Sequence, residues 1–134
     1  MKRRPGGFAK HVILELWEAS NTNSAPTVRK ALRDACKCGN LRLDKVLIHQ
    51  FSPHGVSGVA IIAESHIAVH TWPEYAFAAV DIYSSNSDAD IDEVAKVIKS
   101  AFSPCHANQV EIRRGPGTPR NPAQGKPNNS PDKA

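Results

Sequence analysis

Apolar and polar residues alternate along several short stretches of the chain, which is typical of strands with one buried face. The first such stretch is residues 11–18. Residues 56–63 form a partly β-branched apolar run, and residues 66–70 then alternate histidine or alanine with isoleucine or valine. Residues 77–83 and 109–113 have the same character. We expect a strand in each of these segments.

A further strand is predicted over residues 41–51. Its alternating positions would share one face: Leu41, Leu43, Leu47, His49 and Phe51. Residues 52–55 contain Pro53 and Gly55, a composition typical of turns. This strand and residues 56–63 should therefore form a hairpin.

Two stretches have helical spacing instead. Residues 27–37 place apolar side chains on one face, and Gly39 should end that helix: Val28, Ala31, Leu32 and Ala35. A second helix should begin after Asp90, an N-cap residue with Glu93 at the capping-box position. Its apolar face would consist of Ile91, Val94, Ala95, Ile98 and Phe102.

This order of elements predicts an α+β fold, a mostly antiparallel sheet with two helices packed on one face, one layer of each. A chain of 134 residues has room for one domain. We expect that domain at residues 10–114, after a flexible arm at 1–9 and before a disordered tail at 115–134. Proline and glycine make up eight of the twenty residues of that tail, which has almost no apolar side chains.

The net charge of +4 does not indicate a nucleic-acid partner. Six basic residues and one acidic residue lie in the two end segments, which leaves 11 basic and 12 acidic residues between them, without the basic stripe of a nucleic-acid binder. No apolar run approaches the ~20 residues of a membrane span, so we expect no membrane partner and a cytoplasmic location. Three cysteines, an odd number, do not indicate a disulfide framework.

The polar residues inside the run 64–72 are the candidates for chemistry. His66 and His70 on a strand would share one face but lie about 13 Å apart, too far to hold one metal ion easily. A serine hydrolase is also poorly supported, because residues 55–58 lack the second spaced glycine of a nucleophile elbow and no helix follows.

A third possibility is a backbone reaction at Ser65. Its hydroxyl can attack the carbonyl of Glu64 and convert the amide into an ester; removal of the serine α-proton then breaks the chain, and loss of ammonia leaves a pyruvoyl group. Such a group forms a Schiff base with a substrate amine and accepts the electrons that a departing carboxylate leaves behind. Judged by residue types alone, ordinary polar residues of a sheet remain the favoured alternative.

The order of residues in segments 53–58, 63–75 and 78–83 resembles the short prokaryotic type of S-adenosylmethionine decarboxylase proenzyme. The resemblance runs from about Lys10 to Phe102. It implies a self-cleaving, pyruvoyl-dependent enzyme that decarboxylates S-adenosylmethionine for spermidine biosynthesis. It also implies a homodimer of cleaved protomers, with sites at the interface and no metal requirement.

The resemblance assigns roles to individual residues. Ser65 becomes the covalent pyruvoyl group, Glu64 ends the smaller N-terminal chain, His70 removes the serine α-proton, and Ser57 supports the processing intermediate. The substrate-binding positions would be Phe51 and Trp72, suited to adenine stacking and to attracting a sulfonium, and Glu74, suited to ribose hydroxyls.

Ser85 stands where the family has the cysteine that protonates the decarboxylated carbanion. A hydroxyl is a far weaker acid than a thiol of pKa about 8.5, so proton delivery should slow or pass to water or His70. Ala76 replaces a usual glycine, and Ser52 and His54 also differ from the family pattern. These departures leave two alternatives open: a pyruvoyl-dependent arginine or ornithine decarboxylase on the same scaffold, and an uncleaved, non-catalytic relative.

Overall fold

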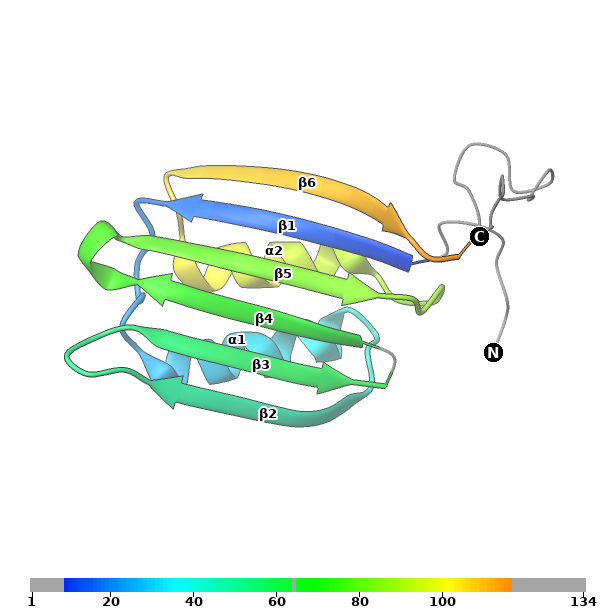
Figure 1. Cartoon of the computed structure of the whole chain (residues 1–134), viewed down its shortest axis with the longest axis horizontal. Helices are drawn as coiled ribbons and strands as arrows, with labels where there is room; N and C mark the ends of the chain where they lie inside the picture. The colour runs from blue at the N-terminus through cyan, green and yellow to red at the C-terminus, as the bar shows by residue number, and fades with distance from the viewer. Residues whose placement is uncertain (1–8, 64, 117–134) are drawn as a thin grey trace, which may run out of the picture.

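The computed structural model describes residues 9–63 and 65–116. Six strands form one sheet in the order β2-β3-β4-β5-β1-β6, and two helices lie on one face of it (Figure 1). The strands are β1 (Ala9–Trp17), β2 (Leu43–Gln50), β3 (Val56–Ile62), β4 (Ser65–Trp72), β5 (Phe77–Ser84) and β6 (His106–Arg114). The helices are α1 (Ala25–Cys38), α2 (Ile91–Phe102) and the 3-10 turn η1 (Pro73–Tyr75). Every neighbouring pair of strands is antiparallel, so the predicted α+β fold is confirmed.

Both helices begin at side-chain caps. The Thr27 amide donates to Ser24 Oγ (3.1 Å) at the start of α1, and the Glu93 amide donates to Asp90 Oδ1 (3.1 Å) at the start of α2. Each bond satisfies one of the backbone donors that a helix leaves unpaired in its first turn. The cap predicted at Asp90 is confirmed.

The hydrophobic core lies between the sheet and the helices. Its largest fully buried side chains come from both layers: Phe102, Leu14, Leu16, Leu32, Ile67, Ile82, Ile98, Val12, Val28, Val56, Val69 and Val80. Gly39 ends α1 as predicted, and a Cβ at this position would lie 2.2 Å from Val94 Cγ2. The absence of a side chain at Gly39 therefore lets α2 pack against the end of α1.

The expectation that Leu41, Leu43, Leu47, His49 and Phe51 share one face is wrong. Leu43 pairs with Ile62 and packs against the core, whereas Leu47 pairs with Val59 and is 52% exposed on the opposite face. A register shift between Leu43 and Lys45 separates the two. An extra residue in one strand moves all later side chains to the other face, because strand side chains alternate.

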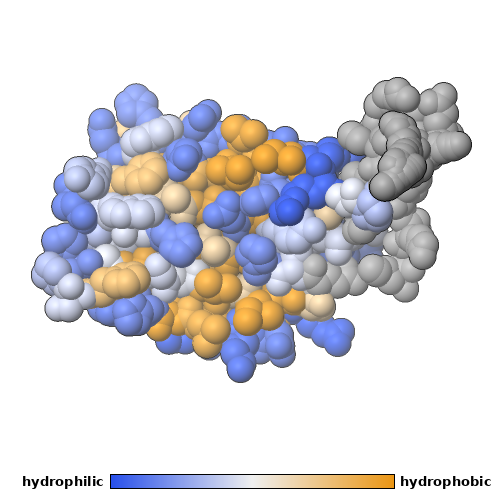
Figure 2. All heavy atoms as spheres, in the orientation of Figure 1, coloured by the Kyte–Doolittle hydropathy of each residue, from blue (hydrophilic) through white to orange (hydrophobic). Residues whose placement is uncertain are grey.

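The face of the sheet that the helices leave open carries exposed apolar side chains. Figure 2 looks onto this face and shows apolar groups over β1 and β6 and over β2 and β3, with polar residues between them. The open-face side chains include Leu47 (52% exposed), Ile61 (38%), Val110 (47%) and Ile112 (42%). Within the described residues, no helix is long and apolar enough to cross a membrane.

Candidate active site

Ser65 is the first residue of β4. Its Oγ is buried and has no hydrogen-bond partner among the described residues. Leaving a buried hydroxyl unpaired costs on the order of 1–3 kcal/mol, so this arrangement is unfavourable for a residue with only a structural role. Glu64, the residue on the other side of the expected cleavage point, lies outside the described residues.

Ser85 follows the last residue of β5 and is half-buried. His66, next to Ser65, pairs with Tyr83, two residues before Ser85. Because β4 begins where β5 ends, Ser65 and Ser85 lie at the same end of the sheet (Figure 1).

Ser57 and His70 form a second pair on the open face. They are register partners on β3 and β4, and a hydrogen bond of 2.8 Å joins Ser57 Oγ to His70 Nδ1. The adjacent strand positions are fixed by the buried Thr71 hydroxyl, which accepts from the Val56 amide (2.8 Å) and donates to the Val56 carbonyl (3.2 Å). Side-chain and backbone bonds thus hold the Ser57–His70 pair in place.

Aromatic side chains gather at the end of β4 opposite Ser65. Trp72 is the last residue of that strand, and its ring centroid lies 5.6 Å from that of Phe77, which lies 6.0 Å from that of Trp17. Phe51 follows β2 at the same end and packs edge-on against His49. Trp72 and Phe51 are 41% and 47% exposed, so their faces are available to a ligand.

The structure brings some of the expected site residues together and keeps others apart. Phe51, Trp72 and Glu74 share one end of the sheet, and the Ser57–His70 pair lies close to it. Ser65 precedes His70 by five strand positions, about 17 Å at a rise of roughly 3.4 Å per residue, and precedes Trp72 by about 24 Å. Within one chain, therefore, His70 cannot reach the α-proton of Ser65.

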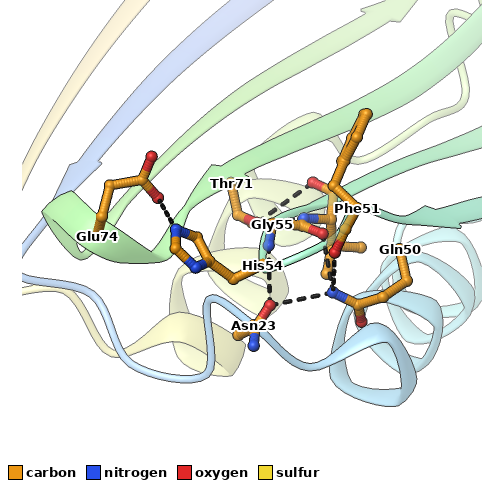
Figure 3. Close-up of polar contacts among 8 residues, drawn as sticks. Asn23, Gln50, Phe51, His54, Gly55, Thr71 and Glu74 are labelled. Atoms are coloured by element: carbon orange, nitrogen blue, oxygen red, sulfur yellow. Dashed lines mark hydrogen bonds and ion pairs between the residues drawn. The ribbon is translucent and has the colours of Figure 1, made fainter.

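Sequence reasoning did not find the side-chain network around the turn between β2 and β3. His54 Nε2 lies 3.0 Å from Glu74 Oε1, and Asn23 bonds both Gln50 and Gly55 (Figure 3). The turn-forming composition around Asn23 was the only sequence signal. The pairings themselves join residues twenty or more positions apart, and no local periodicity reports such contacts.

The three cysteines are free. Cys36 and Cys38 lie in α1, and Cys105 lies at the end of the sheet opposite Ser85. Burial raises the pKa of the Cys36 thiol to about 11. The Cys105 thiol donates a hydrogen bond to the Glu18 carboxylate, and this bond together with the negative charge of Glu18 raises the pKa of Cys105. The Cys105 amide donates to the Trp17 carbonyl at the opposite end of the sheet. Within one chain, Cys36 is thus buried in α1 and Cys105 lies at the end of the sheet opposite Ser85.

Within residues 9–63 and 65–116, no cluster of three or more histidine, cysteine or acidic side chains is arranged to hold a metal ion. His66 and His70 do share the open face, four strand positions apart. The spacing argument against a shared metal ion therefore applies to the folded chain as well.

Comparison with known proteins identifies the family. The S-adenosylmethionine decarboxylase family matches residues 10–115. An S-adenosylmethionine decarboxylase proenzyme of Thermomicrobium roseum is 36% identical over 109 residues, covering 81% of this chain and 94% of the relative. One from Methanococcus vannielii is 40% identical over 110 residues, covering 81% and 90%.

The fold agrees with this match. The crystal structure of the adenosylmethionine decarboxylase from Aquifex aeolicus superposes with a TM-score of 0.77 at 26% identity, covering 89% of this chain and 98% of the other. The two-layer fold with a polar strand at its centre is thus that of a known class of decarboxylases. The chain belongs to the S-adenosylmethionine decarboxylase family.

Proposed function

We propose that this chain is a self-processing decarboxylase that releases carbon dioxide from S-adenosylmethionine. The product, decarboxylated S-adenosylmethionine, is the aminopropyl donor for spermidine. The observation that carries the proposal is the buried hydroxyl of Ser65 at the first position of β4, which has no hydrogen-bond partner among the described residues. The relatives described above are named proenzymes, which fits a chain that must be cut before it acts.

The Ser65 hydroxyl is suited to the cleavage reaction because no other group among the described residues competes for it. Its oxygen attacks the Glu64 carbonyl, and the C–N bond breaks to give an ester and a free amine on Ser65. Removal of the Ser65 α-proton then eliminates the Glu64 carboxylate and leaves a dehydroalanine, which loses ammonia by hydrolysis. The resulting pyruvoyl group supplies an electron sink for decarboxylation when it is present.

The open face of the sheet supports a homodimer. Exposed apolar side chains on three strands of one face, β2, β3 and β6, are the usual mark of an interaction surface. A two-fold axis that lies between two stacked sheets and runs across the strands places opposite strand ends over one another. Ser65 of each copy would then lie near the His70 end of the other, which resolves the separation of about 17 Å within one chain.

In such a dimer, His70 removes the α-proton of Ser65 of the partner subunit, and the Ser57 hydroxyl holds the His70 ring through the 2.8 Å bond. Phe51 and Trp72 then stack on the adenine and attract the sulfonium of the substrate, while Glu74 accepts hydrogen bonds from the ribose hydroxyls. Ser85 of the other copy stands at the proton-donor position. These roles follow from the resemblance. They also fit the fold, which places Ser65 and Ser85 at one end of the sheet and the substrate-binding positions at the other.

The test combines intact mass with carbon dioxide release. The purified protein should give two chains cut between Glu64 and Ser65, and the C-terminal chain should be lighter by one ammonia than a serine-started fragment. Ser65→Ala should give one uncut chain without activity, while Ser87→Ala, an exposed serine beyond β5, should cleave normally. An uncut natural protein after long incubation would favour the non-catalytic relative instead.

Substrate choice needs a separate measurement on cleaved protein. We expect carbon dioxide release from labelled S-adenosylmethionine to exceed release from arginine or ornithine, because Phe51, Trp72 and Glu74 are all present at one end of the sheet. Faster turnover of either amino acid would replace the proposed substrate. The cytoplasmic location, the absence of a metal requirement, and domain limits at residues 10 and 114 stay predictions.

A further inference from the structure

The turn between β2 and β3 is held by side chains from outside it (Figure 3). Asn23 Oδ1 accepts from the Gly55 amide (2.8 Å) and from Gln50 Nε2 (3.0 Å). Gln50 Nε2 also donates to the Gly55 carbonyl (2.9 Å), which accepts from the Phe51 amide as well (2.8 Å). Bonds at both ends of the turn therefore fix the backbone that carries Phe51 and His54.

This turn brings His54 to Glu74. His54 Nε2 and Glu74 Oε1 are 3.0 Å apart, with side chains 38% and 42% exposed. Glu74 lies in η1, which is closed by a bond from the Ala76 amide to the Pro73 carbonyl (3.0 Å). Both members of the pair are thus attached to backbone held by its own hydrogen bonds.

An ion pair this exposed contributes little to stability, because water screens it and each side chain loses rotamer freedom to form it. Its effect is on orientation. A carboxylate has two oxygens, and a bond from His54 Nε2 to Oε1 leaves Oε2 available to a ligand. A glutamate whose rotamer is already fixed loses less conformational entropy when a ligand binds.

We infer that His54 is a positioning residue that orients Glu74 toward the vicinal hydroxyls of the ribose in an adenosyl ligand. The inference rests on the proposed function, since it takes the adenosyl group to lie at the Phe51 and Trp72 end. The bond needs only an N–H at Nε2, which the neutral and the protonated ring can both supply. A glutamine side chain can offer a similar donor, whereas leucine cannot.

The test measures binding of 5′-methylthioadenosine and of its 2′-deoxy form to the processed protein by calorimetry. Neither compound has the amine or carboxylate needed for turnover, so binding is separated from chemistry. His54→Leu should weaken binding of the ribose form by about tenfold, the effect of one oriented bond, and change the 2′-deoxy form little. His54→Gln should keep most of the preference for ribose. With S-adenosylmethionine, His54→Leu should raise KM and leave kcat within about twofold.

His11→Leu provides a matched control, because it removes a histidine paired at the same 3.0 Å with Asp81 on β5. It should leave the ribose-to-deoxyribose preference unchanged. If His54→Leu, or His54→Ala should the leucine variant not fold, keeps the natural preference while Glu74→Gln loses it, the role of His54 is overturned and the proposed function stands. If the natural protein binds neither compound, the proposed function fails, and this inference with it.

Discussion

The two ends of the sheet are built differently. At the end that carries Phe51, Trp72 and Glu74, side-chain bonds link the turn between β2 and β3 to η1 and to the loop before α1. At the other end, Ser65 has a buried hydroxyl without a partner among the described residues. In the proposed function, the first end binds the substrate and the second carries the reaction. Their separation within one chain is the reason that we propose two copies.

The strongest test of this difference between the two ends places an intact Ser65 and an intact His70 on different chains. We expect Ser65→Ala and His70→Ala each to abolish cleavage when expressed alone. Co-expressed, they should restore about a quarter of the natural amount of cut chain, because about half of randomly formed dimers are mixed and each has one intact site. Intact mass on the co-purified chains measures this. No cleavage in the mixture would show that Ser65 and His70 act within one chain.

The second prediction concerns Ser85, at the same end of the sheet as Ser65. Ser85→Cys supplies a donor of pKa near 8.5, and general acid catalysis is typically worth about 10²–10⁴-fold. We expect at least a tenfold rise in turnover of S-adenosylmethionine, measured as carbon dioxide release. Loss of activity during turnover should also slow, because the proton reaches the substrate carbon more reliably.

The control for this prediction is Ser87→Cys, which adds an exposed thiol two residues further along the same loop. It should change neither the rate nor the inactivation. Equal turnover and equal inactivation for the natural protein and Ser85→Cys would mean that Ser85 is not the proton-donor position.

The smallest expected effect concerns the backbone at the binding end. Ala76 adopts φ +49°, in the left-handed region where a Cβ is unfavourable and glycine is not. Ala76→Gly should therefore stabilise the protein by about 1 kcal/mol, or a few degrees in Tm. Thermal unfolding in the uncut Ser65→Ala background measures this on a single chain.

The matched control is Ala79→Gly, in the middle of β5, where glycine should instead cost roughly 0.5–1 kcal/mol. A lower Tm for Ala76→Gly would contradict the strain at residue 76. It would then leave the departure from the family's glycine unexplained.

The periodic elements could be predicted from the sequence because they depend on local patterns. The capped helix after Asp90, the end of α1 at Gly39 and the alternation along β4 all appear as predicted. The inverted face of β2 could not be predicted, since the extra residue between Leu43 and Lys45 has no signature of its own. Strand β6 begins at His106, three residues before the start predicted at Gln109. Its extent is set by backbone pairing with β1, which the pattern of apolar residues does not reveal.

Only the part of the candidate site that lies within the run of residues around Ser65 could be predicted from the sequence. The run around Ser65 indicates a cleavage point and its neighbours. The strand spacing that separates His66 from His70 also places Ser65 about 17 Å from His70, but the run does not indicate how a second copy could bring the two together. The His54–Glu74 pair requires knowledge of how two turns meet.

The strand order limits how the two pieces that cleavage after residue 64 would produce could fold. A break after residue 64 assigns β1, β2 and β3 to one piece and β4, β5 and β6 to the other, yet β1 lies between β5 and β6. The two pieces therefore alternate within the sheet and are joined by the β1–β5, β1–β6 and β3–β4 strand pairs. Neither piece can form this sheet by itself, so folding has to precede cutting. The products should stay together through gel filtration and part only in denaturant.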